Sequence, residues 1–321
     1  MKAVVQTRYG SPDVLRVQDV PQPTPKADEV LIRVRAASLT PSDSAFRKGD
    51  PFLIRIMYGL RKPRLPIGGV EFAGDVVGVG EGVTSFQRGD AVFGMSPDHF
   101  GAHGEYLCLS EAKPVIRKPD GMAYADAVSI ADGPCTALSY LRDVARVQPG
   151  QRVLVNGASG SVGAAAVQLA KHYGAHVTGV CSTRNLELVR SLGADAVIDY
   201  THEDFTRSGQ QWDVIFDAVG KSSYGRCRRA LTPKGMYMTT VPTLGTLVAI
   251  VRTAFGGRKA KFTTAGLKQT KDNLMFLAGL YETGQLRAVI DREYPLDKVP
   301  DAHRYVETER KRGSVVIQVA A

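Results

Sequence analysis

The sequence predicts an α/β protein in which a doubly wound parallel sheet is combined with a β-rich, barrel-like domain formed by both ends of the chain. Residues 1–121 consist mainly of short alternating apolar runs bounded by Gly, Pro or Asp, a pattern typical of antiparallel strands. From about Met122 helical and strand patterns alternate, as expected of βαβ units. We therefore expect a β-rich domain from residues 1–121 and 266–321, and a doubly wound α/β domain from residues 122–265.

The expected elements follow from apolar periodicity. In the β-rich part, strands are expected at 3–7, 15–19, 29–37, 72–79, 91–94 and 104–109. The second part should begin with a helix at 123–145 and continue with strands at 153–155, 176–181, 196–198, 214–217 and 235–240. A helical pattern at 267–282, a further helix near 294–303 and a closing strand at 313–319 return the chain to the first part.

Composition is that of an ordinary globular protein. The 321 residues are 44% hydrophobic and 23% charged, which allows two domains with separate cores. The four cysteines are scattered singly, so neither a disulfide framework nor a cysteine zinc knot is indicated. No apolar run approaches the length of a membrane span, and the N-terminus lacks a signal-peptide pattern, so the expected location is cytoplasmic.

A glycine-rich turn joins a buried strand to a helix. Val153–Val155 supply the strand, Gly157, Gly160 and Gly163 mark the turn, and an apolar helical pattern follows. Such a turn allows tight backbone geometry, close approach of the main chain to phosphates and close packing of helix on strand. Exposed N–H groups and the helix dipole then attract the anion. The segment therefore predicts a binding site for a dinucleotide pyrophosphate, although a purely structural turn would share its glycines.

The end of the next strand indicates which dinucleotide. About 20 residues after the glycine turn, NAD-binding proteins place an acidic residue against the ribose 2′-hydroxyl. Here Ser182, Thr183 and Arg184 stand there instead. Hydroxyls and a guanidinium can bind a 2′-phosphate through charge-assisted hydrogen bonds, so NADP(H) is the expected cofactor. The alternative is that Arg184 is only a solvated residue at a helix start.

The net charge of +9 raises the question of a nucleic-acid partner. Basic residues cluster modestly at 55–64, 226–229, 252–261 and 304–312, but no nucleic-acid-binding module is recognisable. Solvated basic faces are the preferred interpretation, and a nucleic-acid partner is not expected. A positive field would also attract an anionic cofactor.

The whole chain resembles the medium-chain dehydrogenase/reductase superfamily, in its zinc-less quinone-oxidoreductase-like branch. The motifs that carry this resemblance lie at 36–43, 69–80, 86–94 and 191–200, together with the glycine turn. It implies a GroES-like β-rich catalytic domain, a Rossmann domain, a substrate cleft where they meet, and a homodimer paired through the edge of the Rossmann sheet.

The resemblance also places the cofactor. A basic residue such as Arg184 and a tyrosine such as Tyr200 would flank the 2′-phosphate, with Ser182 as a further candidate. Segments equivalent to 134–136, 218–220 and 240–242, with a later strand around 262–264, would surround the nicotinamide. The expected cofactor-binding residues are Pro134, Thr136, Gly157, Ala158, Ser159, Gly160, Ser161, Val162, Gly163, Ser182, Arg184, Tyr200, Val219, Thr240, Val241, Phe262 and Thr264.

No metal is expected. The catalytic-zinc positions of zinc-dependent relatives match Thr40, Val70 and Asp132, and zinc requires thiolate, imidazole or carboxylate ligands. Val70 cannot be such a ligand and Thr40 is a poor one. His99 and His103 have metal-like spacing only on a helix, but the glycines around them predict a loop or strand entry, so a structural or surface role is expected.

The expected chemistry is hydride delivery to a carbon that is already electrophilic, as in an alkenal, an enone or a quinone. Candidate donors to the developing oxyanion are Thr40, Ser42, Arg47 and Tyr58. Two other functions stay open: a zinc-independent, NADP-linked alcohol or aldehyde oxidoreductase, and a non-catalytic NADPH-binding protein with affinity for RNA.

Two apolar segments are distinctive. Residues 47–66 are apolar and basic, and could form a short amphipathic helix acting as a lid, a packing element or a membrane-surface segment, in that order of preference. Residues 244–255 are apolar for too short a stretch to span a bilayer, and are expected to line the cleft or a subunit contact.

Overall fold

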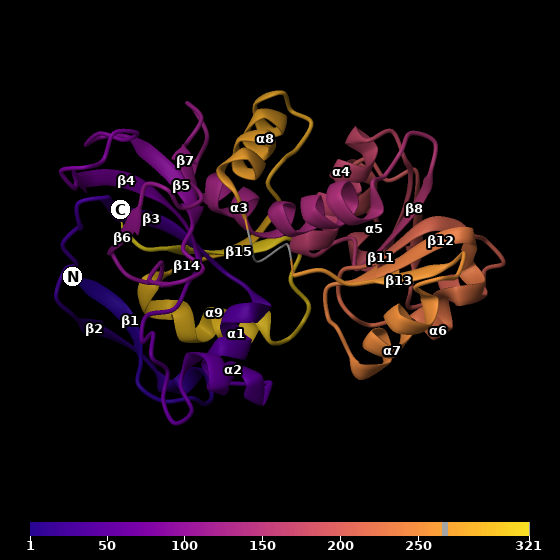
Figure 1. Ribbon diagram of the computed structural model, residues 1–321, viewed down its shortest axis with the longest axis horizontal. Helices are drawn as coiled ribbons and strands as arrows, with labels where there is room; N and C mark the ends of the chain where they lie inside the picture. Colours follow the sequence, from indigo (N-terminus) through magenta and orange to yellow (C-terminus); the bar gives the residue numbers. More distant parts are fainter. Residues whose placement is uncertain (265–268, 321) are drawn as a thin grey trace. The chain divides into compact units, whose positions relative to one another are not determined.

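The computed structural model describes residues 1–264 and 269–320, and its chain divides into two compact units (Figure 1). Unit 1 comprises Met1–Asp132, Gln269–Glu282 and Arg287–Ala321. Unit 2 comprises Gly133–Lys268 and Thr283–Leu286. Helix α3 (Tyr124–Leu138) contributes to both units. The domain limits expected from the sequence stay a prediction.

Unit 2 is built on a parallel six-stranded sheet in the order β10-β9-β8-β11-β12-β13. Its strands are β8 (Arg152–Asn156), β9 (His176–Cys181), β10 (Ala196–Asp199), β11 (Trp212–Asp217), β12 (Leu231–Thr239) and β13 (Lys259–Lys261). The order reverses between β8 and β11, which is the pattern of a doubly wound nucleotide-binding sheet. The expected fold class is therefore confirmed, and with it strands β8 to β12.

The helices of unit 2 connect these strands. They are the second part of α3, the helical stretch Ser139–Ala145, α4 (Ser161–His172), α5 (Leu186–Ser191), α6 (Tyr224–Cys227) and α7 (Leu244–Thr253). Leu154, Ile215, Trp212 and Tyr237 pack together in a buried cluster of the sheet. This core fixes the carboxyl ends of the central strands, where the glycine turn begins.

The strand expected around 262–264 lies slightly earlier, because β13 covers Lys259–Lys261. This strand pairs only with β12 and forms an edge of the sheet. An edge strand contacts the core on one side only, so its sequence can be mostly basic and shows no apolar periodicity. The apolar segment 244–255 contains helix α7, which the sequence analysis had not assigned.

Unit 1 is β-rich. Strands β1 (Lys2–Gln6) and β2 (Leu15–Asp19) form an antiparallel pair. The larger sheet has the order β14-β15-β3-β4-β5-β7, with β6 paired to β3. Its strands are β3 (Glu29–Leu39), β4 (Glu71–Val79), β5 (Ala91–Met95), β6 (Tyr106–Ser110), β7 (Val115–Arg117), β14 (Ile290–Pro295) and β15 (Ser314–Gln318). Both chain ends thus contribute to one sheet, as the sequence predicted.

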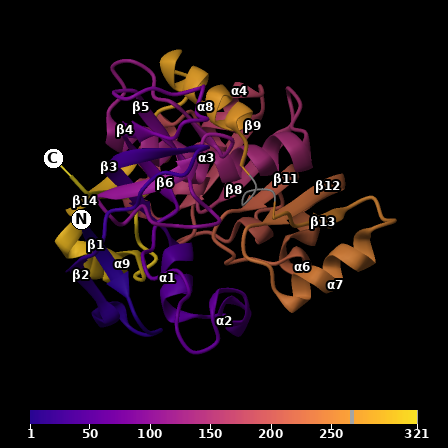
Figure 2. The same cartoon turned by 60° about the vertical axis from the view of Figure 1, so that its left-hand side comes forward.

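The helices of unit 1 are α1 (Pro41–Lys48), α2 (Phe52–Tyr58), α8 (Lys271–Glu282), α9 (Val299–Val306) and the first part of α3. Helix α2 follows α1 directly, and α9 lies beside α1 although it comes from the other end of the chain (Figure 2). The expected helix at 267–282 is confirmed from Lys271 onward, and residues 267 and 268 lie outside the described residues.

Among residues 1–264 and 269–320, no helix combines the length and the apolar composition needed to cross a bilayer.

Candidate active site

The carboxyl ends of β8 and β11 lie side by side at the point where the strand order reverses. Asn156 and Asp217 are register partners, and the side-chain amide of Asn156 donates a 2.9 Å hydrogen bond to Asp217 Oδ1. The Tyr237 hydroxyl donates to Asp217 Oδ2 at 3.1 Å. Asp217 is fully buried, so these bonds satisfy its oxygens and link β8, β11 and β12. Ligands of open α/β sheets bind at this kind of edge.

The glycine turn follows Asn156 and has the steric requirements expected of it. Gly157 has a φ of +81°, and a Cβ there would lie 2.4 Å from Val219 Cγ1. A Cβ at Gly163 would lie 2.1 Å from the carbonyl oxygen of Gly157. At Gly160 the nearest protein atom to such a Cβ is 3.6 Å away, so space remains on that side of the turn.

The turn leads directly into the N-terminus of helix α4. Gly160 is the N-cap of α4 and has no side chain to cap the helix. The first N–H groups of a helix have no partner within the helix, and the macrodipole places partial positive charge there. The backbone at Gly160–Gly163 therefore fits a diphosphate, and it is the part of the chain that could hold the pyrophosphate of a dinucleotide.

Helix α3 packs against the start of α4. A Cβ at Gly133 would lie 2.3 Å from Ser161 Oγ, so only glycine permits this approach. The next residues, Pro134 and Thr136, are thereby placed near the start of α4, and their expected contact with the nicotinamide stays a prediction. Cys135 between them is fully buried, which suits a small packing residue.

The expected nicotinamide-side residues gather at the same edge of unit 2. A Cβ at Gly220 would lie 2.6 Å from Val241 Cβ, so the segments after β11 and β12 touch. Thr240 Oγ1 donates to the carbonyl of Ala218 at 3.1 Å. The Tyr140 hydroxyl donates to the carbonyls of Thr239 and Thr263 at 2.7 and 3.2 Å. This tyrosine fixes the chain between Phe262 and Thr264 beside the end of β12.

Val219 and Val241 are 40% and 50% exposed, which is unusual for valines in so well packed a region. They stand at the carboxyl edge of the sheet, next to the glycine turn. A bound planar ring would cover apolar surface of this kind.

The expected 2′-phosphate segment follows β9. Ser182 is half-buried, and its hydroxyl accepts a 3.3 Å hydrogen bond from the Asn185 amide, which also donates to Ser159 Oγ at 2.9 Å. Asn185 therefore ties this segment to the glycine turn. Arg184 and Tyr200 are exposed, Tyr200 by 62%.

Asp199 is a carboxylate beside this segment that the sequence analysis did not consider. It is the register partner of Cys181, and it accepts hydrogen bonds from the hydroxyls of Thr183 and Thr201. These bonds, led by that of Thr183, lower the pKa of Asp199 to about 2, so it is ionised at neutral pH. The sequence did offer a signal for Asp199, because it directly follows the strand pattern at 196–198.

The four expected catalytic residues all lie in unit 1. Thr40 is the N-cap of α1, and its backbone N–H and hydroxyl both donate to Asp43 Oδ2 at 2.8 and 2.7 Å. Its hydroxyl proton is thus used within the capping box. Ser42, in the first turn of α1, is exposed to solvent.

Arg47 lies in α1 and lines the same small cavity of unit 1 as Tyr58. It is only 1% exposed, and its guanidinium donates to the carbonyl of Gly10 and to Glu307. Burial lowers its pKa and Glu307 opposes that change. These contacts give Arg47 the structural role of joining α1 to the turn after α9.

Tyr58 packs in an aromatic cluster with Phe46 and Phe100, at ring-centroid distances of 4.9 and 5.5 Å. It also lines a small cavity of about 40 Å³ inside unit 1. The same cavity touches His103 and His303. His303 is buried against Ser44 Oγ at 3.1 Å, and burial holds the pKa of this imidazole well below its usual range.

His103 is also buried, with Nε2 3.0 Å from the carbonyl oxygen of Ser38, whereas His99 is exposed. The two histidines therefore do not share a site, in agreement with the structural role predicted for His103.

Unit 1 contains a cluster of acidic residues, in which Glu71 and Asp43 are buried. Glu71 follows Val70 and accepts a hydrogen bond from Ser38 Oγ. Burial, with Asp132 and Asp43 nearby, raises the pKa of Glu71 well above its usual range, which favours the protonated carboxyl. In the part of the chain that the structure describes, no group of three His, Cys, Asp or Glu is arranged to hold a metal ion.

Several functional candidates were missed because they act through contacts distant in sequence. Glu307 and His303 come from the other end of the chain, and Tyr140 acts through backbone carbonyls. Glu71 could have been recognised from the sequence, because an acidic residue within an apolar strand requires hydrogen-bond partners when it is buried.

Two family models match the chain. Residues 26–120 match the alcohol dehydrogenase GroES-like domain, and residues 192–317 match a model described as zinc-binding dehydrogenase. The second description names the wider family, while in this chain Val70 and Thr40 stand at two of the metal positions that the resemblance implied.

Curated relatives match over nearly the full chain. A 2-methylene-furan-3-one reductase of Solanum lycopersicum is 35% identical, covering 99% of this chain and 79% of the relative. An NADPH-dependent alkenal/one oxidoreductase of Arabidopsis thaliana, chloroplastic, is 33% identical with the same coverage.

Among solved structures, the quinone oxidoreductase from Coxiella burnetii has a TM-score of 0.90 at 32% identity and covers 100% of this chain and 99% of its own. Together with the site geometry, these matches show an oxidoreductase that uses a nicotinamide cofactor. The chain belongs to the medium-chain dehydrogenase/reductase superfamily, in its quinone-oxidoreductase-like branch.

Proposed function

We propose that this protein is an NADPH-dependent, zinc-independent reductase that transfers hydride to an activated double bond or a quinone. The observation that carries the proposal is the glycine turn at the reversal point of the sheet, followed one strand later by Ser182 and Arg184. Relatives named as an alkenal/one oxidoreductase and a quinone oxidoreductase support this substrate class.

The preference for NADPH rests on the segment after β9. Ser182 and Arg184 supply a hydroxyl and a guanidinium where a 2′-phosphate would lie, and Tyr200 offers an exposed ring beside them. Asp199 adds a negative charge to the same region, but two threonine hydroxyls already donate to its oxygens. In this proposal the attraction between Arg184 and the 2′-phosphate is stronger than the repulsion by Asp199, whose oxygens already accept hydrogen bonds.

The backbone of Gly160–Gly163 would bind the pyrophosphate, and Val219 and Val241 would pack against the nicotinamide. Bound NADPH supplies the hydride, and the protein supplies orientation and electrostatic stabilisation. A substrate of the proposed class already has an electrophilic carbon, so it needs hydrogen-bond donors to its oxygen rather than a Lewis acid.

Among the expected donors, Ser42 and Tyr58 fit this role best, because Ser42 is exposed and the Tyr58 hydroxyl is in no hydrogen bond to a described residue. Thr40 and Arg47 would have to give up their bonds to Asp43, Gly10 and Glu307. We therefore place Ser42 and Tyr58 first and keep Thr40 and Arg47 as positioning residues for α1.

The deciding experiment follows NADPH oxidation with a 2-alkenal, an enone and a quinone, each with and without a metal chelator. Turnover of at least one class that is unchanged by the chelator is the expected result. Absence of turnover with all three would overturn the proposal, and so would loss of turnover on chelation. Reduction of NADP by an alcohol panel would instead favour the alcohol oxidoreductase alternative.

We also propose that the protein forms a homodimer and acts in the cytoplasm. The edge strand β13 has an outer side without a partner strand among the described residues, and parallel edges of this kind can pair between subunits. Light scattering should give twice the mass of one chain at micromolar concentration, and a monomer mass would contradict the dimer.

A further inference from the structure

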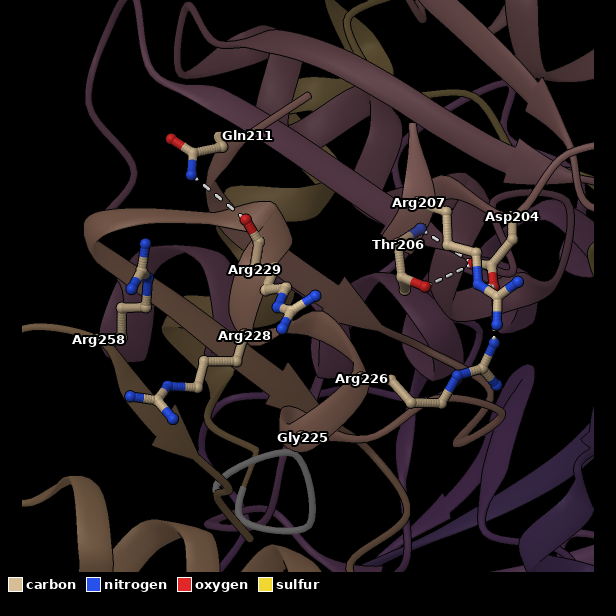
Figure 3. Close-up of a pocket in the computed structure, with 9 residues that line it drawn as sticks. All are labelled: Asp204, Thr206, Arg207, Gln211, Gly225, Arg226, Arg228, Arg229 and Arg258. Carbon is tan, nitrogen blue, oxygen red and sulfur yellow. Dashed lines mark hydrogen bonds and ion pairs between the residues drawn. The ribbon is translucent and has the colours of Figure 1, made fainter. Parts of the chain in front are cut away.

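Unit 2 contains a pocket lined largely by arginines. It lies at the opposite end of the strands from the glycine turn. It encloses about 840 Å³ and is lined by Asp204, Thr206, Arg207, Gln211, Gly225, Arg226, Arg228, Arg229 and Arg258 (Figure 3). A volume of this size matches sites for small molecules.

The position of the pocket follows from the strand directions. Gln211 precedes β11, Arg228 and Arg229 precede β12, and Arg258 precedes β13. The glycine turn, in contrast, comes after β8, which is parallel to β11 and in register with it. The six residues of β11 separate the two ends by about 17–20 Å. The arginine pocket is therefore distinct from the proposed cofactor site.

The charges of the pocket are poorly compensated. Among the described residues that line it, Asp204 is the single acidic one, and it is already engaged by Thr206 and by Arg226, whose guanidinium lies 3.1 Å away. These hydrogen bonds, led by that of Thr206, lower the pKa of Asp204. Within residues 1–264 and 269–320, the side chains of Arg228 and Arg229 have no hydrogen-bond or ion-pair partner.

Other contacts hold these arginines in place. The carbonyl of Arg229 accepts a 3.2 Å hydrogen bond from the Gln211 side chain. Arg258 Nε donates to the carbonyl of Leu231 at 3.0 Å, which fixes the base of its guanidinium while its terminal nitrogens have no partner in the described chain. In Figure 3, Arg258, Arg228 and Arg229 stand on one side of the pocket and the Asp204 group on the other.

The sequence around the pocket is also strongly basic. The 54 residues from Ala218 to Lys271 contain eleven Lys or Arg and no Asp or Glu, whereas the net charge of the whole chain is +9. The entire positive excess therefore originates in this stretch, and folding brings Arg226–Arg229 and Arg258 from its two ends to one pocket. The sequence analysis had treated both clusters as solvated faces.

We propose that this pocket binds a compact anion that carries several phosphate groups. Guanidinium groups form paired, charge-assisted hydrogen bonds with phosphate oxygens, and several arginines close together favour a ligand with several charges in a small volume. Among the described residues that line the pocket none is aromatic, so it offers no aromatic ring on which nucleobases could stack. The ligand would bind together with NADPH, because the two sites lie at opposite ends of the strands.

Inorganic tripolyphosphate is a suitable probe, measured by calorimetry at about 0.1 M salt with the protein saturated in NADPH. Saturation blocks the glycine turn, so binding there is excluded. We expect one site per chain, with the dissociation constant raised at least tenfold in R228Q/R229Q. The control R190Q/R252Q removes the same charge from exposed arginines elsewhere in unit 2 and should change it less than twofold.

Three results would overturn the proposal: no binding to the NADPH-saturated protein, an equal loss in both double variants, or tighter binding of a uridine hexanucleotide or hexaglutamate than of tripolyphosphate. NADPH affinity serves as the check of folding. If R228Q/R229Q fails that check, R228Q alone should still weaken tripolyphosphate binding at least threefold, and an unchanged constant would contradict the site. Titration without NADPH separates this test from the proposed function, because tripolyphosphate should bind the pocket even if NADPH does not bind.

Discussion

Single residues determine how the glycine turn can be altered. Gly160 and Gly163 lie three residues apart, yet a Cβ at Gly160 would be in ordinary van der Waals contact with the Gly157 carbonyl oxygen, at 3.6 Å, whereas a Cβ at Gly163 would lie 2.1 Å from the same atom. A substitution at Gly160 should therefore affect the approach of a ligand, and a substitution at Gly163 should affect the packing of the protein.

For this reason we expect Gly163→Ala to lower the free energy of unfolding by about 1–3 kcal/mol, the usual cost of overpacking. Gly160→Ala should change stability little but weaken NADPH binding, because its Cβ would project where the pyrophosphate approaches. Urea unfolding and NADPH titration of both variants test this contrast. Equal destabilisation by the two substitutions would contradict it.

Arg184 carries the proposed selectivity for NADPH. Replacing it in Arg184→Ala removes a charge-assisted bond of about 1.5–3 kcal/mol, so KM for NADPH should rise at least tenfold. KM for NADH should change less than twofold, since NADH has no 2′-phosphate. Arg190→Ala, one helix further on, is the matched control. A similar rise of KM for both cofactors would show that Arg184 does not read the 2′-phosphate.

His303 should make stability depend on pH. Its pKa in the folded protein lies well below the ordinary value of about 6.5, because burial disfavours the cation. As pH falls below about 6.5 the unfolded chain takes up a proton that the folded protein does not, so stability decreases. Between pH 7 and 5 the His303→Gln variant should lose less stability in urea unfolding than the native chain. Parallel curves would contradict this.

At the scale of elements, α2 is a helix without a covered apolar face. Phe52, Leu53, Ile56 and Met57 are 63, 60, 55 and 59% exposed. Arg61, Lys62 and Arg64 follow it, all exposed. The expected short helix is confirmed, and its exposed apolar side chains argue against a mainly packing role.

We therefore expect the double substitution Phe52→Ser with Met57→Ser to leave the melting temperature nearly unchanged and to raise KM for long-chain enones more than for short ones, as a lid requires. Met275→Ser, at an equally exposed site on α8, is the control. Unchanged KM values together with reduced binding to anionic vesicles would favour the membrane-surface role instead.

At the scale of the whole molecule, the sequence predicted the fold class, the origin of the β-rich part from both chain ends, and strands β8 to β12. These succeed because Val153–Val155 and Phe72–Val79 have strong local apolar patterns. β13 was misplaced because an edge strand with the sequence Lys-Ala-Lys has no such pattern.

In the candidate site, too, some residues could be recognised from local sequence and others depend on contacts distant in sequence. The turn 157–163 could be recognised from local sequence, because its glycines stand between the strand pattern of Val153–Val155 and a helical pattern. Arg47 could not be interpreted from its neighbours in sequence, since its partner Glu307 is 260 positions away. The arginine pocket likewise joins positions 207, 226–229 and 258, and each cluster alone resembles an ordinary solvated surface.

The tight packing of Gly157 and Gly163 also limits how coenzyme preference can evolve in this protein. A side chain at Gly157 would clash with Val219 and one at Gly163 with the backbone, whereas Ser182, Arg184 and Tyr200 border on solvent and can vary without repacking. Relatives that change their coenzyme preference should therefore differ at Ser182, Arg184 and Tyr200, while Gly157 and Gly163 stay unchanged.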